Sequence, residues 1–178
     1  MILEIELPLL RNTDISIVSK IKQLVFVVSQ HVPFKPNIIA PSSKIKTTRK
    51  TLLEYLNYLN EAKVFHSLYK STHGIGLLQK LEKLFLENTN YMYAIQQDAP
   101  NKGSLREIFF LNQLSESHQL TYPDKGDFLV DNTYVFEIGA KDKNNKQIVG
   151  GTNAFIASDG IEIGFENKIP LWMLGFLY

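Results

Sequence analysis

Two carboxylates, Asp127 and Glu137, stand ten residues apart on either side of a short turn. Segments 128–130 and 134–138 are rich in β-branched and aromatic residues, and the residues at 131–133 between them have the composition of a turn. This pattern predicts a β-hairpin. Antiparallel pairing across so short a turn brings the outer ends of the strands together, so both carboxylates are expected near one end of a sheet. That layout is typical of a divalent-metal site.

The stretch from Asp127 through Glu137 to Lys141 resembles the PD-(D/E)xK nuclease-like core. In that core an Asp and a Glu hold Mg²⁺, and a Lys two residues after the Glu assists the attacking water. The flanking sequences GSLREIFFLNQL and IEIGFENKIPLWMLGFLY resemble the C-terminal domain of a family of bacterial and archaeal AAA-type ATPases. In that family a P-loop module is followed by a winged helix and then by this nuclease-like domain. The resemblance covers nearly all 178 residues of this chain and corresponds to the part of the family's proteins that follows the ATPase module.

The resemblance implies a site for Mg²⁺ or Mn²⁺ formed by Glu107, Asp127 and Glu137, with Lys141 as a further catalytic candidate. Glu107 matches an acidic position on the family's helix. In this chain that helix is predicted to begin at Ser104 as its N-cap, with Glu107 in its first turn. The alternative is that Glu107 is a carboxylate favoured by the helix N-terminus, without a catalytic role.

The lysine of the resembled motif is displaced in this chain, because Gly139 stands two residues after Glu137. Lys141 is about 13 Å further along the strand, since four residues each rise about 3.3 Å. Lys143 and Lys146 are alternative sources of the amino group, although the lysines of this segment are most simply a solvated face. A degenerate site is the simpler interpretation.

Helical periodicity dominates the first part of the chain. Apolar residues recur at helical spacing over 15–30, which predicts a helix after Asp14 as its N-cap. Prolines 33 and 36 end it, and a short second helix is placed over 37–45. A third helix is predicted from Thr47 as its N-cap, and four leucines are expected to point inward: Leu52, Leu53, Leu56 and Leu59. Segments 64–69 and 83–86 are predicted as strands around a glycine-containing tip.

Three helices followed by two strands indicate a winged helix-turn-helix over residues 1–100. The resemblance to the family extends here to LLEYLNYLNEA and KLFLENTNYMYAI. Residues 41–70 hold six basic and two acidic side chains, a net charge of +4, whereas residues 103–178 hold six basic and ten acidic side chains, a net charge of −4. Duplex DNA binding through the third helix and the wing is one interpretation, and its candidate contacts are Thr48, Arg49, Lys50, Lys70 and His73. A winged helix that packs on the ATPase module or on another subunit is the alternative.

Residues 103–178 are predicted to form the nuclease-like domain, a small mixed sheet flanked by helices. Its first helix is expected to turn Leu105, Phe109 and Leu114 inward. A closing helix over 171–177 is expected to dock Trp172 and Phe176 on the sheet. Strands are predicted over 119–122, 127–130, 134–138, 154–157 and 161–165. The fold class is therefore α+β (α/β).

Several motifs are missing from the sequence. There is no cysteine for a disulfide or thiolate site, and no apolar run of about 20 residues. Glu4 and Glu6 stand where a signal peptide would carry basic residues, so we expect a soluble, cytoplasmic protein without a membrane partner. The resemblance to a bacterial and archaeal family implies a prokaryotic protein. No G-x-x-x-x-G-K-[ST] occurs, so no ATP site is expected in this chain.

These patterns favour one function and leave two alternatives. The favoured function is the C-terminal nucleic-acid-binding or assembly region of an AAA-type ATPase, with the ATPase module in cis or in trans and homo-oligomers formed through it. The alternatives are a Mg²⁺-dependent DNA nuclease and a structural protein-interaction module. We expect this chain alone not to be catalytic.

Overall fold

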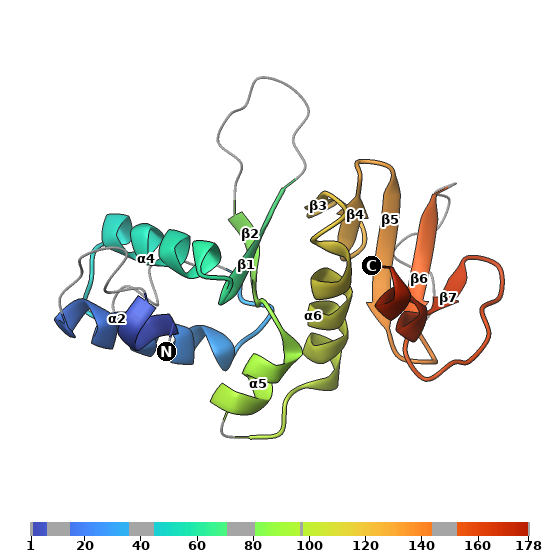
Figure 1. The fold of residues 1–178 in the computed structure, drawn as a ribbon. Coiled ribbons are helices and arrows are strands. Elements are labelled where there is room, and N and C mark those ends of the chain that lie inside the picture. The colour runs from blue at the N-terminus through green and yellow to red at the C-terminus, as the bar shows by residue number, and fades with distance from the viewer. Residues whose placement is uncertain are drawn as a thin grey trace. The chain divides into compact units, whose positions relative to one another are not determined.

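The computed structural model describes residues 2–6, 15–35, 45–70, 81–96, 98–143 and 153–177. Within these residues the chain is α+β, with helices and two sheets (Figure 1). It divides into two compact units, one formed by Met1–Ser67 and Leu84–Ala99 and the other by Leu68–Lys83 and Pro100–Tyr178. The last crossing of the chain between the units, from Ala99 to Pro100, falls next to the boundary predicted near residue 100, but residues 68–83 group with the second unit.

The first unit contains most of the helices that the structure describes. Its elements are η1 (Ile2–Glu6), α2 (Ile15–Ser29), α4 (Arg49–Glu61) and α5 (Thr89–Ile95). Strands β1 (Phe65–Tyr69) and β2 (Leu81–Leu86) form a two-stranded sheet, and the division between the units falls within both strands. Both long helices bury a stripe at the i, i+3, i+4, i+7 spacing, which is the reason this sequence forms amphipathic helices here. The stripes are Ile21, Leu24, Val25 and Val28 on α2, and Leu52, Tyr55, Leu56 and Leu59 on α4.

Two details of α4 differ from the prediction. Leu53 is 38% exposed, because it follows Leu52 by one residue and so lies about 100° around the helix from the buried stripe, which includes Tyr55 instead. The N-cap is Thr48 rather than Thr47, since the Thr48 side chain accepts a hydrogen bond from the Thr51 backbone N–H at 3.2 Å. Several predictions lie outside the described residues: Asp14 as an N-cap, Pro36, almost all of the helix over 37–45, and the roles of His73 and Lys146.

The second unit contains a five-stranded sheet covered by helix α6 (Lys102–Leu114), as Figure 1 shows. Its strands lie in chain order, with β3, β4 and β5 antiparallel and β5, β6 and β7 parallel. Their bounds are β3 Leu120–Thr121, β4 Phe128–Val130, β5 Tyr134–Gly139, β6 Ala154–Ser158 and β7 Lys168–Pro170. The 3-10 helix η2 (Leu171–Phe176) follows β7.

Aromatic contacts join α6 to the sheet. Phe110 of α6 stacks on Phe128 of β4 with ring centroids 4.9 Å apart and contacts Phe136 of β5 at 5.0 Å. Phe136 stacks in turn on Phe155 of β6 at 5.6 Å. Phe110 and Phe128 are fully buried, so these rings fix α6 against the strands that carry the candidate site.

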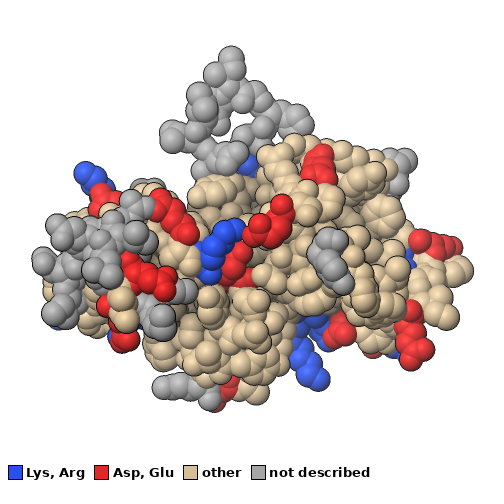
Figure 2. Space-filling view, viewed as in Figure 1, with Lys and Arg blue, Asp and Glu red and all other residues tan. Residues whose placement is uncertain are grey.

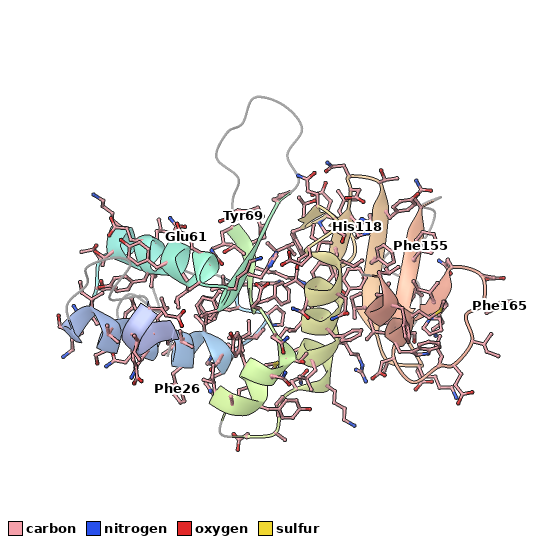
Figure 3. The ribbon with its side chains drawn as sticks, in the orientation of Figure 1. Phe26, Glu61, Tyr69, His118, Phe155 and Phe165 are labelled. Carbon is pink, nitrogen blue, oxygen red and sulfur yellow. The ribbon has the colours of Figure 1, made fainter. Side chains whose placement is uncertain are left out.

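Several predictions for this unit were wrong. The helix begins earlier, because Asn101 is its N-cap and accepts from the Gly103 and Ser104 backbone N–H groups, and this moves Glu107 beyond the first turn. Residues 161–165 are not a strand; the last strand is β7, while Ile163 and Phe165 are 84% and 75% exposed. Figure 3 shows Phe165 pointing away from the strands.

The closing aromatic residues also differ from the prediction. Trp172 and Phe176 do not dock on the sheet, because they are 51% and 67% exposed and contact each other edge to face. The Trp172 indole N–H donates instead to the Ile161 carbonyl at 3.1 Å. Of the residues predicted to face inward on α6, Leu114 is buried, whereas Leu105 and Phe109 are only partly buried. None of the described helices combines the length and the apolar character needed to cross a lipid bilayer.

Candidate functional site

Asp127 lies at the entrance to β4, where the hairpin fixes it. Gly126 precedes it with φ of +91°, a conformation that glycine adopts without a Cβ penalty. The Asp127 backbone N–H donates to the Phe136 carbonyl at 2.8 Å, and its Oδ2 accepts from the Ile138 backbone N–H at 2.9 Å. One carboxylate oxygen of Asp127 is therefore committed to β5, and the other is available for a cation.

Glu107 lies on the inward-facing stripe of α6. Ser104, Ile108 and Leu111 are buried, and Glu107 completes the i, i+3, i+4, i+7 pattern with them. A carboxylate on such a stripe needs a partner, because burying an unpaired charge is costly.

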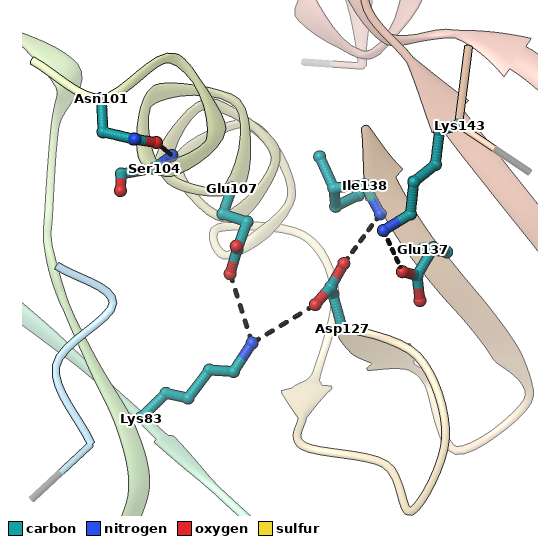
Figure 4. Close-up of polar contacts among 8 residues, drawn as sticks. All are labelled: Lys83, Asn101, Ser104, Glu107, Asp127, Glu137, Ile138 and Lys143. Atoms are coloured by element: carbon teal, nitrogen blue, oxygen red, sulfur yellow. Dashed lines mark hydrogen bonds and ion pairs between the residues drawn. The ribbon is translucent and has the colours of Figure 1, made fainter. Parts of the chain in front are cut away.

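That partner is Lys83 of β2, a residue that the sequence analysis did not single out. Its Nζ lies 3.3 Å from Glu107 Oε2 and 3.4 Å from Asp127 Oδ1, as Figure 4 shows. It also lies 5.1 Å from the centre of the Tyr122 ring, which is within the range of cation–π attraction. The Lys83 side chain is only 7% exposed, so the ammonium group sits between two carboxylates with little access to water.

Charge and burial act against each other in this group. Burial lowers the pKa of Lys83, but the carboxylates of Glu107 and Asp127 outweigh it, so the net effect is a raised pKa and a firmly protonated amine. Burial raises the pKa of Glu107, Lys83 opposes this rise, and the nearby charges of Asp127 and Glu137 add to it. The structure thus brings the three predicted carboxylates into one neighbourhood.

Glu137 of β5 forms an ion pair with a different lysine, Lys143. The Glu137 side chain is 1% exposed, and its Oε1 lies 2.5 Å from Lys143 Nζ. Lys143 reaches it across Gly139: a Cβ added to Gly139 would lie 2.4 to 2.8 Å from the Cγ, Cβ and Cδ atoms of Lys143. The Lys143 side chain therefore occupies the space that a side chain at position 139 would fill.

Lys168 of β7 holds the turn that carries Lys143. Its Nζ donates to the Lys141 carbonyl at 2.5 Å and to the Lys143 carbonyl at 3.1 Å. The Lys143 backbone N–H closes the turn by donating to the Ala140 carbonyl at 2.9 Å. Lys141, the lysine favoured from the sequence, is exposed, and the lysine whose ammonium meets Glu137 is Lys143. We call Lys83, Glu107, Asp127, Glu137 and Lys143 the charge cluster.

The charge cluster does not fit a divalent ion in this arrangement. Mg²⁺ binds carboxylate oxygens at about 2.0–2.1 Å, and the oxygens it would take from Glu107 and Asp127 face the Lys83 ammonium. The remaining Asp127 oxygen accepts from Ile138, and Glu137 is paired with Lys143. Within the described parts of the chain, no three carboxylate or imidazole side chains group closely enough to hold a metal ion.

The candidate DNA contacts lie outside the charge cluster, and they differ in exposure and in charge pairing. Thr48 caps α4, and Lys50 is exposed in the first turn of that helix, whereas nothing is described of the Arg49 side chain. Lys70 is paired with Asp124 at 3.0 Å, so a carboxylate already offsets its charge. On the face drawn in Figure 2, basic and acidic side chains are interspersed.

One signal in the sequence could have identified Lys83. Lys83 belongs to the apolar strand β2, and the three residues that follow it, Leu84, Phe85 and Leu86, are buried as it is. A lysine at an inward position of an apolar strand requires a buried carboxylate partner. No comparable signal marks Lys143, because its role depends on how the turn folds back over Gly139.

Comparison of the chain with protein-family models, with curated proteins and with solved structures found no match.

Proposed function

We propose that this chain is a nucleic-acid-binding or assembly region of an AAA-type ATPase and that its nuclease-like unit does not hydrolyse DNA. The proposal rests on Lys83, whose ammonium lies between Glu107 and Asp127, where a nuclease of this type would use a metal ion. Without a bound metal, the unit lacks the group that would stabilise charge on a phosphate during cleavage. Binding and assembly functions remain, and both accord with the sequence resemblance.

DNA contact is assigned to the start of α4. Lys50 is exposed there, and the preceding Thr48 cap holds the first turn in helical geometry. Each contact between a lysine and a phosphate releases counterions. In a plot of log affinity against log salt concentration, the loss of one such contact should therefore make the slope shallower by about 0.9. A winged helix that contacts few phosphates therefore binds duplex DNA weakly and with little sequence preference.

The test is an electrophoretic mobility shift over a series of salt concentrations, together with plasmid nicking in Mg²⁺ and in Mn²⁺. Lys50→Ala should weaken DNA binding and flatten the salt dependence, and Arg49→Ala combined with it should do so further. Lys63→Ala is the matched control, because it removes the same charge beyond the other end of α4. If Lys50→Ala and Lys63→Ala weaken the retardation of DNA equally, the assignment of the DNA contact to the first turn of α4 is contradicted.

A Mg²⁺-dependent nuclease is the second candidate, and a specific contact favours it. Lys143 lies over Gly139 and reaches Glu137, which supplies an amino group near the position where the resembled motif has its lysine. Nicking that requires Mn²⁺ and disappears in both Asp127→Ala and Lys143→Ala would favour this candidate over the non-catalytic one.

A further inference from the structure

Lys83 is a buried cation of the second unit, and two carboxylates lie beside it. Glu107 and Asp127 each have an oxygen within 3.4 Å of its Nζ, and the Tyr122 ring covers another side. These N–O distances exceed the roughly 2.7–2.9 Å of a strong charge-assisted hydrogen bond. Lys83 therefore acts here chiefly as a charge, which is also what a metal ion would supply.

The Asp127 carboxylate and the helix that carries Glu107 are both held by contacts that do not involve Lys83. Asp127 is fixed by its bond from the Ile138 backbone N–H and by the pairing of β4 with β5. Glu107 projects from α6, which is fixed by the Phe110 contacts to the sheet. Removing the amino group would thus leave two partly buried carboxylates on fixed elements, which repel each other and favour any small cation.

We propose that Lys83 is an internal counter-ion that keeps divalent cations out of the Glu107–Asp127 pair, and that a neutral residue at position 83 would turn this pair into a divalent-cation site. The inference rests on the proposed non-catalytic function, since it explains why a nuclease-like unit would keep its carboxylates without using them for hydrolysis. The ligand is a hard divalent ion such as Mn²⁺ or Mg²⁺, because the donors are carboxylate oxygens and water can complete the coordination.

The experiment measures the melting temperature of the full chain during titration with MnCl₂, in the absence of DNA. Lys83→Met keeps most of the side-chain volume and removes the charge. The wild type should show no response, whereas the variant should gain roughly 5 to 10 °C at about 100 times its dissociation constant. Calorimetric titration should show a binding heat for Lys83→Met alone.

Three further variants sharpen the test. Lys83→Met combined with Asp127→Asn should lose the response, because one of the two carboxylates is gone. Lys143→Met, which removes the other lysine of the charge cluster but keeps Lys83, should show no shift of its own melting temperature when Mn²⁺ is added. Lys83→Gln is the second neutral variant, and either neutral variant that unfolds without metal should refold when Mn²⁺ is added.

Two outcomes would overturn the inference: a wild-type response to Mn²⁺ as large as that of Lys83→Met, or no response and no refolding in both neutral variants. The proposed function is tested by separate measurements. Cleavage of DNA by the wild type, or the absence of any DNA retardation and of any assembly with an ATPase module, would overturn it without involving the Mn²⁺ titration of the variants.

Discussion

Replacing Gly139 by alanine should destabilise the protein, although the backbone at this position is not one that favours glycine. Positive φ values among the described glycines occur at Gly126 and Gly160, not at Gly139. At a position of ordinary geometry, Gly→Ala usually stabilises by about 0.4–1 kcal/mol, because it restricts the unfolded chain. The expected sign is opposite here because of the Lys143 side chain.

The magnitude follows from the contacts of the new methyl group. It would lie 2.4 Å from Lys143 Cγ and 2.5 Å from Lys143 Cβ. The Lys143 Cβ is bonded to the backbone, so it can move away only if the backbone of the turn moves too. Lys168 and the Ala140 carbonyl hold that turn, so Lys143 must leave Glu137 or the sheet must yield. Overpacking costs about 1–3 kcal/mol, and breaking a fully buried ion pair costs about 3–5 kcal/mol. Because Lys143 is 32% exposed, we expect a loss near the lower figures, about 2–3 kcal/mol.

Urea unfolding of the full chain would measure this loss, and a double-mutant cycle with Lys143→Gly would assign its cause. If the clash with Lys143 is responsible, the double variant should be little worse than the worse single variant. Gly175→Ala is the control, because its added methyl would meet Phe109 only at 3.4 Å. If the loss in the double variant equals the sum of the two single losses to within about 0.5 kcal/mol, the explanation is refuted, because independent sites are additive in this way.

Three further predictions concern other parts of the chain. Thr48→Ala should cost about 1 kcal/mol of stability by removing the α4 cap, and Thr47→Ala should cost much less when both are measured by urea unfolding. Hydrogen bonds from His118 and from the Gln119 backbone lower the pKa of Asp131 below its usual 3.8, so its stabilising effect is present above pH 3.8 and is lost as the pH falls through the folded-state value. Asp131→Asn should therefore flatten the fall in melting temperature below pH 3.8, and an unchanged fall would exclude this contact as a cause. ATP at micromolar concentration should give no binding heat with this chain, because the sequence contains no P-loop motif.

Local patterns were sufficient for most of the secondary structure. Helices α2 and α4 follow from apolar residues at helical spacing, and the β4–β5 hairpin follows from turn residues that tolerate positive φ, with Asp131 at +50° and Asn132 at +53°. The prediction of a strand over 161–165 was wrong. Its alternating apolar residues include Ile163 and Phe165, which are exposed and so do not form the buried face of a sheet. Periodicity indicates which residues share a face but not whether another element covers it.

The candidate site was predictable only in part, and the reason is sequence separation. Asp127 and Glu137 were placed together correctly because one short hairpin carries both. Lys83 is 44 residues before Asp127, and no local pattern links them. Lys143 depends on the absence of a side chain at position 139, which in the sequence alone looks like the loss of a motif.

The division of the chain has a consequence for any attempt to separate its parts. The second unit takes residues 68–83 as well as everything from Pro100 onward, so the polypeptide passes between units at three points. A fragment of residues 103–178 would lack both Lys83 and the Tyr69 carbonyl that accepts from the Tyr122 backbone N–H. Its Glu107 and Asp127 would lose their shared ammonium, and β3 would lose a neighbour. Recombination with another protein by a single crossover would therefore separate residues that depend on one another, and a transferable module must carry residues 68–83 with it.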